Sequence, residues 1–300
     1  MAEMKRRQRS TQSALLKGTE TILVSALALG LLGFPATAQF GSPQADRAAR
    51  PEAKYDSAVL TDKPSAYWTM GSPLRATEKD RTGHDHTGTY FGRPAAATLP
   101  NGDTAADFDG GREYLQVADS AALSPATRGL LTIEAWMRPD TVTFTGEGGS
   151  NHYVHWMGKG QPNNHEYVAR FYSKDDPDRP NRISGYLFNS SGGKGAGAYF
   201  EEKVSAGKWI HYVFVINANA KSDKYPNGYS KIYRDGVLKK TVDLSYRGSA
   251  VVPTRGNAPL RVATRDGGSF FDGAIGKVAI YTKELSGKRI GAHFNAMTQK

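Results

Sequence analysis

The 300-residue chain contains no cysteine. That absence excludes cysteine nucleophiles, thiolate metal sites and thiol redox chemistry. The chain also lacks a serine nucleophile elbow and a phosphate-binding glycine loop, so two common enzyme signatures are missing. A chain of this length can bury enough apolar surface to fold without disulfides.

Long apolar segments are almost absent, and the one that exists lies near the N-terminus. Residues 21–34 form an apolar run, preceded by five basic residues and followed by small residues at 36–38. This is the pattern of a secretory signal peptide, and the run is shorter than the roughly 20 residues of a membrane span. We expect residues 1–38 to direct export to the periplasm or the extracellular space, leaving no stable membrane span. An uncleaved anchor is the alternative.

Runs of like charge are also missing, which argues against a nucleic-acid-binding arm. The chain has 39 basic and 29 acidic residues, of which five and two lie in residues 1–38. The remainder therefore carries a net charge of about +7. Such an excess favours anionic partners, acidic polysaccharides among them, although it also occurs in proteins that bind nothing anionic.

Beyond the N-terminal segment, the pattern is almost wholly that of β-structure. Residues 39–53 are rich in alanine, proline and charge and predict a flexible leader. From residue 54 to 300, short apolar runs alternate with Gly, Asn, Asp and Pro turns. Helical turns are expected at 286–294, with Ser286 as the cap, and at 120–123. The pattern predicts one all-β domain, a two-sheet antiparallel sandwich. Strands are expected near 66–70, 105–108, 114–117, 131–138, 152–157, 167–172, 183–188, 198–200, 209–216, 230–234, 237–243, 260–263 and 274–281.

The alternation of side chains predicts which face of each strand is buried. In TIEAWMR, YVARFYS and RISGYLFN, apolar or small residues share one face and polar or aromatic residues share the other. The run WIHYVFVI is apolar on both faces, which predicts a central, covered strand.

Eight motifs in order resemble one family. SAYWTMG, DRTGHDHTGTY, ADFDG, YLQVADSAALSP and LTIEAWMRP, followed by GKWIHYVFVI, KIYRDGVL and SFFDGAIGKVAIYTKELS, are similar to the laminin G-like (concanavalin A-like) domain of bacterial secreted proteins. The resemblance covers roughly residues 54–297. It implies a jelly roll whose last strand pairs near its first and whose C-terminal helical turn caps an open end. It also implies core positions for Phe270, Phe271, Val278 and Ile280. The fold hosts lectins, binding modules, glycosidases and lyases, so it fixes no activity.

The resemblance also implies a structural Ca²⁺ ion. The matching positions are Asp80 in the DRTG turn and Asp109 in FDGG, and hard cations prefer such oxygen ligands. Lys277 stands where the family often has an acid. The alternative is that both aspartates only stabilise turns.

A group of polar and aromatic side chains is expected to lie across one sheet. Flat rings suit the apolar faces of sugars, and guanidinium groups suit carboxylates or sulfates. If that sheet face is concave, it forms a groove for an acidic oligosaccharide. Alternatively, some of these residues form a second buried layer with satisfied hydrogen bonds. The predicted ligand-binding residues are Glu134, Trp136, Arg138, Arg170, Tyr172, Arg182 and Tyr186, with His155 beside them.

These observations favour a secreted, monomeric, lectin-like carbohydrate-binding module without catalytic activity. The alternative is a polysaccharide lyase for uronic-acid polymers, with Tyr186, His155 and Arg170 as its catalytic residues. A glycosidase needs two carboxylates across a groove, and Glu134 has no partner at a telling spacing. A purely structural or protein-adhesion module is the third possibility.

Overall fold

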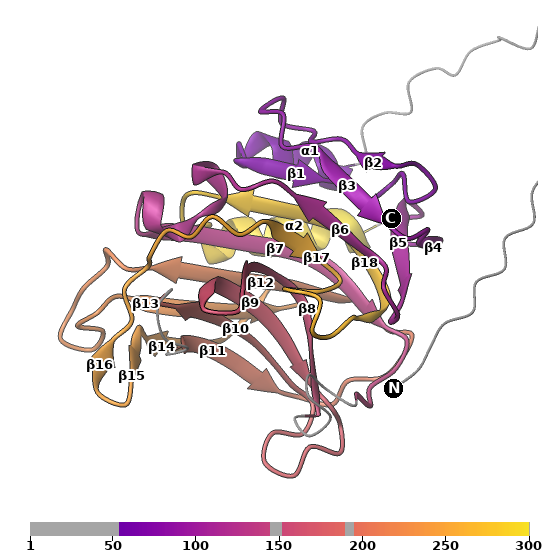
Figure 1. Ribbon diagram of the computed structural model, residues 1–300. Helices are drawn as coiled ribbons and strands as arrows, with labels where there is room; N and C mark the ends of the chain where they lie inside the picture. Colours follow the sequence, from indigo (N-terminus) through magenta and orange to yellow (C-terminus); the bar gives the residue numbers. More distant parts are fainter. Residues whose placement is uncertain (1–53, 145–151, 190–194, 300) are drawn as a thin grey trace, which may run out of the picture. The chain divides into compact units, whose positions relative to one another are not determined.

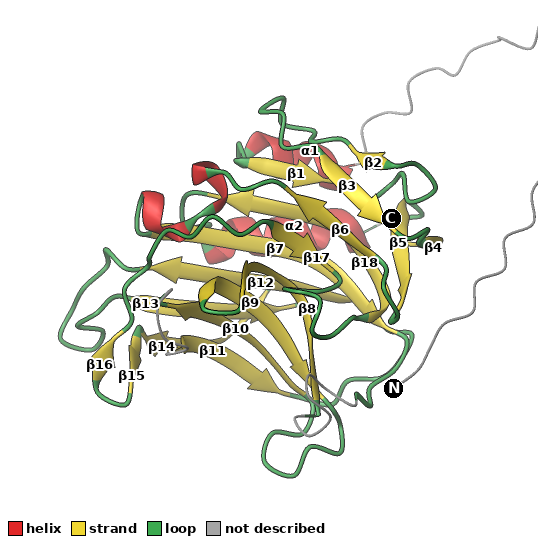
Figure 2. Cartoon of the chain, viewed as in Figure 1, coloured by secondary structure: helices red, strands yellow, loops and turns green. Residues whose placement is uncertain are grey.

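A computed structural model describes residues 54–144, 152–189 and 195–299. The predicted signal peptide and leader lie outside the described residues. Two antiparallel sheets pack face to face, as Figures 1 and 2 show. No helix in the described ranges is long and apolar enough to cross a membrane. The predicted all-β sandwich is confirmed.

Sheet 1 contains the last long strand of the chain at an interior position, between β7 and β5. The short strand β1 pairs with that last strand, Ala66 opposite Ile280, which confirms the expected meeting of the two chain ends. In spatial order, sheet 1 consists of β14 (Val237–Asp243), β13 (Tyr229–Arg234), β12 (Ile210–Asn217), β7 (Leu130–Pro139), β18 (Asp272–Tyr281), β5 (Thr104–Asp109) and β4 (Ala95–Thr98), with β1 (Ala66–Trp68) against β18.

Sheet 2 begins with three consecutive antiparallel strands joined through short connections, β9 lying between β8 and β10. A small hairpin of β15 (Ser245–Tyr246) and β16 (Ser249–Ala250) pairs with neither sheet, but β15 lies against β11, an edge strand of sheet 2. In spatial order, sheet 2 consists of β11 (Gly195–Glu201), β10 (Arg182–Phe188), β9 (Asn164–Tyr172), β8 (Tyr153–Gln161), β17 (Leu260–Val262), β6 (Tyr114–Val117), β3 (Gly88–Phe91) and β2 (Thr77–Glu78).

The main core lies between the sheets and follows the alternation in the sequence. Ile133 and Met137 of β7 point into it from sheet 1, and Phe171 and Ile183 of β9 and β10 point into it from sheet 2. The expected central strand is β12, buried on both faces except at its last residue. Of the four predicted core positions near the C-terminus, Phe271, Val278 and Ile280 are fully buried and Phe270 is half-buried.

A second apolar cluster covers the outer face of sheet 1. Helix α2 (Gly287–Thr298) begins after Ser286, whose side chain accepts a hydrogen bond from the Arg289 backbone and so caps the helix. Ile290 and Met297 of α2 pack with Val213 of β12 in this cluster. The expectation that the terminal turn caps an open end of the sandwich is therefore wrong, because the helix is long enough to cover a sheet face.

The sequence patterns did not predict helix α1 (Lys54–Thr61), which packs against α2. Its eight residues are too few to be stable alone. Burial of Tyr55 and Val59 in the second apolar cluster supplies the stability that the helical propensity of α1 does not. The other short helical turns are η1 (Ala121–Leu123), capped by Ser120, and η2 (Pro125–Thr127).

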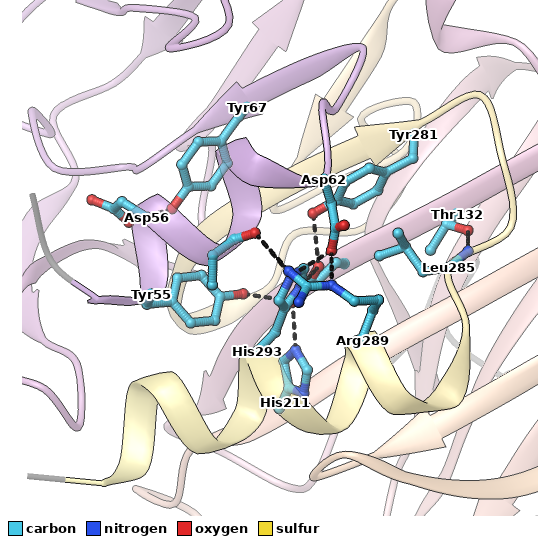
Figure 3. Close-up of polar contacts among 12 residues, drawn as sticks. Tyr55, Asp56, Asp62, Tyr67, Thr132, His211, Tyr281, Leu285, Arg289 and His293 are labelled. Carbon is cyan, nitrogen blue, oxygen red and sulfur yellow. Dashed lines mark hydrogen bonds and ion pairs between the residues drawn. The ribbon is translucent and has the colours of Figure 1, made fainter.

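Beneath the two helices, a carboxylate is buried in a complete shell of donors. Glu134 of β7 is fully buried. Its Oε1 accepts hydrogen bonds from the Tyr55 hydroxyl (2.8 Å) and lies 2.9 Å from His211 Nε2, while its Oε2 accepts from the Tyr281 hydroxyl (3.1 Å) and lies 3.0 Å from His293 Nδ1. Figure 3 shows these four partners converging from α1, α2 and sheet 1. We call Glu134 and its partners the Glu134 cluster.

The Glu134 cluster should make stability depend on pH. Burial alone would lower the pKa of His293, but the charges of Glu134 and Asp62 outweigh it and raise that pKa above its usual 6.5. A raised folded-state pKa stabilises the fold fully below the unfolded value and loses that contribution as pH rises through the folded value. Burial would likewise raise the pKa of Glu134, but His293 and His211 hold it well below its usual 4.5, so its contribution is lost as the solution is acidified.

We therefore expect this contribution to be complete between about pH 4.5 and 6.5 and to fall as the pH rises through the raised pKa of His293. Urea unfolding of the wild type and of His293→Gln at pH 5.5 and pH 9 measures it. The variant should lose less stability between the two pH values than the wild type. Parallel pH profiles would contradict the assignment, and the exposed His84→Gln is the matched control.

Candidate functional site

The outer face of sheet 2 carries a pocket lined by arginine and aromatic side chains. Because Phe171 and Ile183 point into the core, their neighbours on β9 and β10 point outward. The cavity has a volume of about 270 Å³. We call it the basic pocket; its lining includes Arg170, Tyr172, Arg179, Arg182, Tyr186 and Phe188.

Tyr172 holds two guanidinium groups in place. Its hydroxyl accepts hydrogen bonds from Nη1 of Arg170 and from Nη1 of Arg179, both at 2.9 Å. Burial would raise the pKa of Tyr172, but the charges of Arg170 and Arg179 outweigh it and lower that pKa. The pKa of Tyr186, in contrast, is raised by burial and by the neighbouring Tyr172. The environment thus separates the pKa values of the two tyrosines.

His155 supports Arg170 from below. Its side chain is fully buried, and its Nε2 accepts a hydrogen bond of 3.0 Å from Arg170 Nε. Burial, followed by the nearby charges of Arg170 and Arg265, holds the pKa of His155 well below its usual value, so the ring is neutral. The Arg170 guanidinium also lies 4.3 Å from the centre of the Tyr153 ring, a cation–π distance. Arg170 is therefore positioned before any ligand arrives.

The far side of the basic pocket is built on β10 and β11. Arg182 Nε donates to Glu201 Oε1 at 2.7 Å, and its guanidinium lies 3.9 Å from the centre of the Tyr199 ring. The ammonium group of Lys240 lies 3.6 Å from the centre of the same ring. Arg182 is therefore the cation that lines this side of the pocket, and it is held by Glu201 and by the Tyr199 ring.

The structure divides the predicted ligand-binding residues between two sheets. Arg170, Tyr172, Arg182 and Tyr186 meet in the basic pocket, with His155 beneath them. The expectation that Glu134, Trp136 and Arg138 lie across the same sheet is wrong, because β7 belongs to sheet 1.

Those three residues have structural partners on sheet 1. Glu134 and Trp136 are buried under the helices, which matches the alternative of a second buried layer. Arg138 pairs with Asp107 and Asp140. Alternation marks an outward-facing residue but does not reveal which sheet its strand joins.

The predicted calcium ligands do not meet. The carboxylate of Asp80 accepts hydrogen bonds from the backbones of Tyr67, Thr82 and His86, as a turn-stabilising aspartate does. Tyr67 pairs with Ala279 of β18, whereas Asp109 pairs with Asp272 seven residues earlier on that strand, about 20 Å away.

The lysine that stands where the family often has an acid is also paired within the protein. Lys277 is buried, with its Nζ 2.6 Å from Asp56 Oδ1 and 2.8 Å from Asp103 Oδ2. No group of three or more potential ligands suited to a metal ion occurs within the described ranges. Structural calcium, with Asp80 and Asp109 as its candidate ligands, stays a prediction.

A second cavity, of about 360 Å³, lies beside the basic pocket. Tyr153 and Phe270 contribute rings to its wall, and Asp109 and Asp272 contribute carboxylates. We call it the acidic pocket. Burial and the charges of Asp140, Asp107 and Asp109 raise the pKa of Asp272.

The sequence patterns did not single out Tyr153, Arg179 or Asp272 as site residues. The alternation of Tyr153 with the core residue Val154 could have identified its outward orientation. The position of Arg179 follows only from the path of its loop.

The two-sheet fold agrees with comparisons to known proteins. A family model described as the concanavalin A-like lectin/glucanases superfamily matches residues 109–291, and the chain belongs to that family. The matching model is a laminin G-like member of that superfamily. A search by sequence among curated proteins found no match.

Solved structures of similar fold include known binding domains. Domain 4 of AbnA, an extracellular arabinanase from Geobacillus stearothermophilus in complex with arabinotriose, has a TM-score of 0.54 and 18% identity, over 77% of this chain and 98% of that one. The binding domain of botulinum neurotoxin DC in complex with rat synaptotagmin II has a TM-score of 0.58 and 16% identity, over 80% and 53%. The same toxin domain in complex with SialylT gives 0.57 and 15%, over 80% and 53%. This chain spans about half of the toxin chains, and at such identities the likeness shows the fold alone.

Proposed function

We propose that this chain is an exported, non-catalytic module that binds an acidic polysaccharide in the basic pocket. The observation that carries the proposal is the convergence of Arg170, Arg179 and Arg182 with Tyr172 and Tyr186 in one cavity. Guanidinium groups bind carboxylates or sulfates through paired hydrogen bonds, and tyrosine rings pack against apolar sugar faces. The net positive charge outside residues 1–38 supports an anionic partner.

Similar structures support a glycan partner. The arabinanase domain was solved with arabinotriose, and a toxin binding domain was solved with SialylT. The rigidity of the basic pocket also supports the proposed binding function. Tyr172, His155 and Tyr153 already hold Arg170 in place, and this lowers the entropy cost of binding. We include export in the proposal on the pattern of residues 1–38, and sequencing of the mature N-terminus checks it.

A glycan array with acidic and neutral members tests this function. We expect retention of uronate or sulfated glycans that weakens as salt is raised, since the contacts are ionic, and no retention of neutral glycans. Repeating the array with a chelator tests the calcium prediction separately. Equal retention of neutral glycans, or no retention of any glycan, would contradict the proposal; the latter result would favour a structural or protein-adhesion module.

One observation favours a polysaccharide lyase as the second candidate. Tyr172, between two guanidinium groups, has the lowered pKa that a tyrosine base needs, whereas Tyr186 does not. His155 is fully buried, so in the predicted trio it positions Arg170 and cannot contact a substrate. Incubation with alginate or glucuronan, followed by the absorbance of new double bonds, separates the two functions. A rise that Tyr172→Phe abolishes would establish the lyase.

A further inference from the structure

The basic and acidic pockets share a wall. Tyr153 lines the acidic pocket, and its ring lies 5.3 Å from the ring of Tyr172 in the basic pocket, centre to centre. The guanidinium of Arg170, which also lines the basic pocket, lies 4.3 Å from the centre of the Tyr153 ring. Tyr153 pairs with Tyr172 across β8 and β9, so both rings stand on the outer face of sheet 2. The contacting rings of Tyr153 and Tyr172 therefore separate the two cavities.

The wall of the acidic pocket opposite Tyr153 is hydrogen-bonded to β8, the strand that carries Tyr153. Gly268, Ser269 and Phe270 form part of its lining. The Ser269 hydroxyl accepts a hydrogen bond of 3.1 Å from the backbone of His155, two residues after Tyr153. The Ser269 carbonyl accepts a hydrogen bond of 2.6 Å from the Thr264 hydroxyl. Because both pockets are attached to β8, their positions relative to each other are fixed.

The pockets carry opposite charge. Among the described residues that line them, the basic pocket has three arginines and no acid, while the acidic pocket has two aspartates and no lysine or arginine. Arg138, the nearest cation on sheet 1, pairs with Asp107 and Asp140 rather than with the lining aspartates. Thr141, Thr143 and Ser269 add hydroxyl groups to the acidic pocket.

This arrangement selects different sugars on the two sides of Tyr153. A uronate or sulfated unit suits the arginines and is repelled by Asp109 and Asp272. An uncharged sugar offers hydroxyl donors that the two carboxylates accept, and hydrogen bonds to charged acceptors are the stronger kind. Phe270 and Tyr153 supply rings for its apolar face.

We propose that the two pockets are adjacent subsites for an alternating polysaccharide, with an anionic unit in the basic pocket and an uncharged unit in the acidic pocket. The inference rests on the proposed function and narrows it from acidic polysaccharides in general to polymers that alternate the two kinds of unit. A polymer with a carboxylate on every unit can fill the basic pocket but places a second carboxylate beside Asp109 and Asp272.

Titration calorimetry of the full chain with two purified oligosaccharide series tests this. One series is an alternating glucuronate–N-acetylhexosamine oligosaccharide, and the other is an oligoglucuronate of the same number of units. We expect the wild type to bind the alternating oligosaccharide roughly tenfold more tightly, the size of one charge-assisted hydrogen bond. The double variant Asp109→Asn, Asp272→Asn should lose this preference by binding the oligoglucuronate more tightly. The double variant Asp85→Asn, Asp223→Asn removes two charges at exposed positions outside both pockets and should keep the preference.

The outcomes distinguish the inference from the proposed function. If the wild type binds the oligoglucuronate as tightly as the alternating series, the inference is overturned and the proposed function holds. If both series bind only through the acidic pocket, so that Arg170→Ala changes neither affinity, the proposed function and the inference both fail. If neither series binds but another acidic glycan on the array does, the alternating uronate assignment is overturned alone.

Discussion

Replacing Glu134 with alanine is expected to lower the free energy of unfolding by about 3–5 kcal/mol. Glu134 is fully buried and is the common partner of Tyr55, His211, Tyr281 and His293. Its removal leaves His293 with Asp62 as its remaining charged partner and two tyrosine hydroxyls without their acceptor. The helices α1 and α2 lose these hydrogen bonds to β7 and keep apolar packing there, such as that of Phe294 on Trp136, so their face of sheet 1 should open first.

Guanidinium-induced unfolding followed by circular dichroism measures this loss. Glu134→Gln preserves the shape and part of the hydrogen bonding, so its loss should be clearly smaller than that of the alanine variant. Asp223→Ala, at an exposed position, should change stability by less than about 0.5 kcal/mol. Similar stabilities for Glu134→Ala and the wild type would show that the cluster does not hold the helices.

Replacing Arg170 with alanine is expected to weaken binding of the alternating uronate oligosaccharide roughly hundredfold. Arg170 is the residue that joins the two pockets, since it contacts Tyr172 on one side and lies over Tyr153 on the other. Its loss removes a cation from the basic pocket and releases the Tyr172 hydroxyl, which then holds only Arg179. Calorimetry should show the weaker affinity together with a reduced dependence on salt, because one ionic contact is lost.

Arg128→Ala removes the same charge from an exposed position outside both pockets and should leave the affinity nearly unchanged. Tyr172→Phe tests whether positioning alone matters, because it keeps every cation but removes their shared acceptor. We expect a smaller loss, roughly tenfold. If the Arg128 and Arg170 variants bind equally, attraction depends on overall charge and the basic pocket is not the site.

The layered fold could be predicted well from the sequence, because the alternation within each strand is enough to show which side chains face the core. The alternation in TIEAWMR placed Ile133 and Met137 in the core, and the doubly apolar run WIHYVFVI placed β12 at the centre of sheet 1. Helix α1 was not predicted because eight residues carry little helical signal, and its stability comes from Tyr55 and Val59 packing against residues far away in the chain.

The candidate site was predicted only in part because sheet membership is not local. Glu134 and Arg170 both alternate with core residues, and each points away from the core. Their strands, however, join different sheets: β7 pairs with β12 and β18, which are distant in the sequence, whereas β9 pairs with its sequence neighbours β8 and β10. Arg170, Tyr172, Arg182 and Tyr186 met because β9 and β10 are consecutive strands of one hairpin-like pair.

The position of β18 constrains when the sandwich can form during synthesis. The strand is interior to sheet 1, and Ser65 beside β1 contacts Thr282 just after β18 across 217 residues. A chain that has emerged from the ribosome only as far as β17 has no partner for β1 and lacks the strand that joins β7 to β5. Such distant pairing slows folding, so an emerging chain spends its whole elongation time with sheet 1 split and with the edges of β7 and β5 that face β18 unpaired.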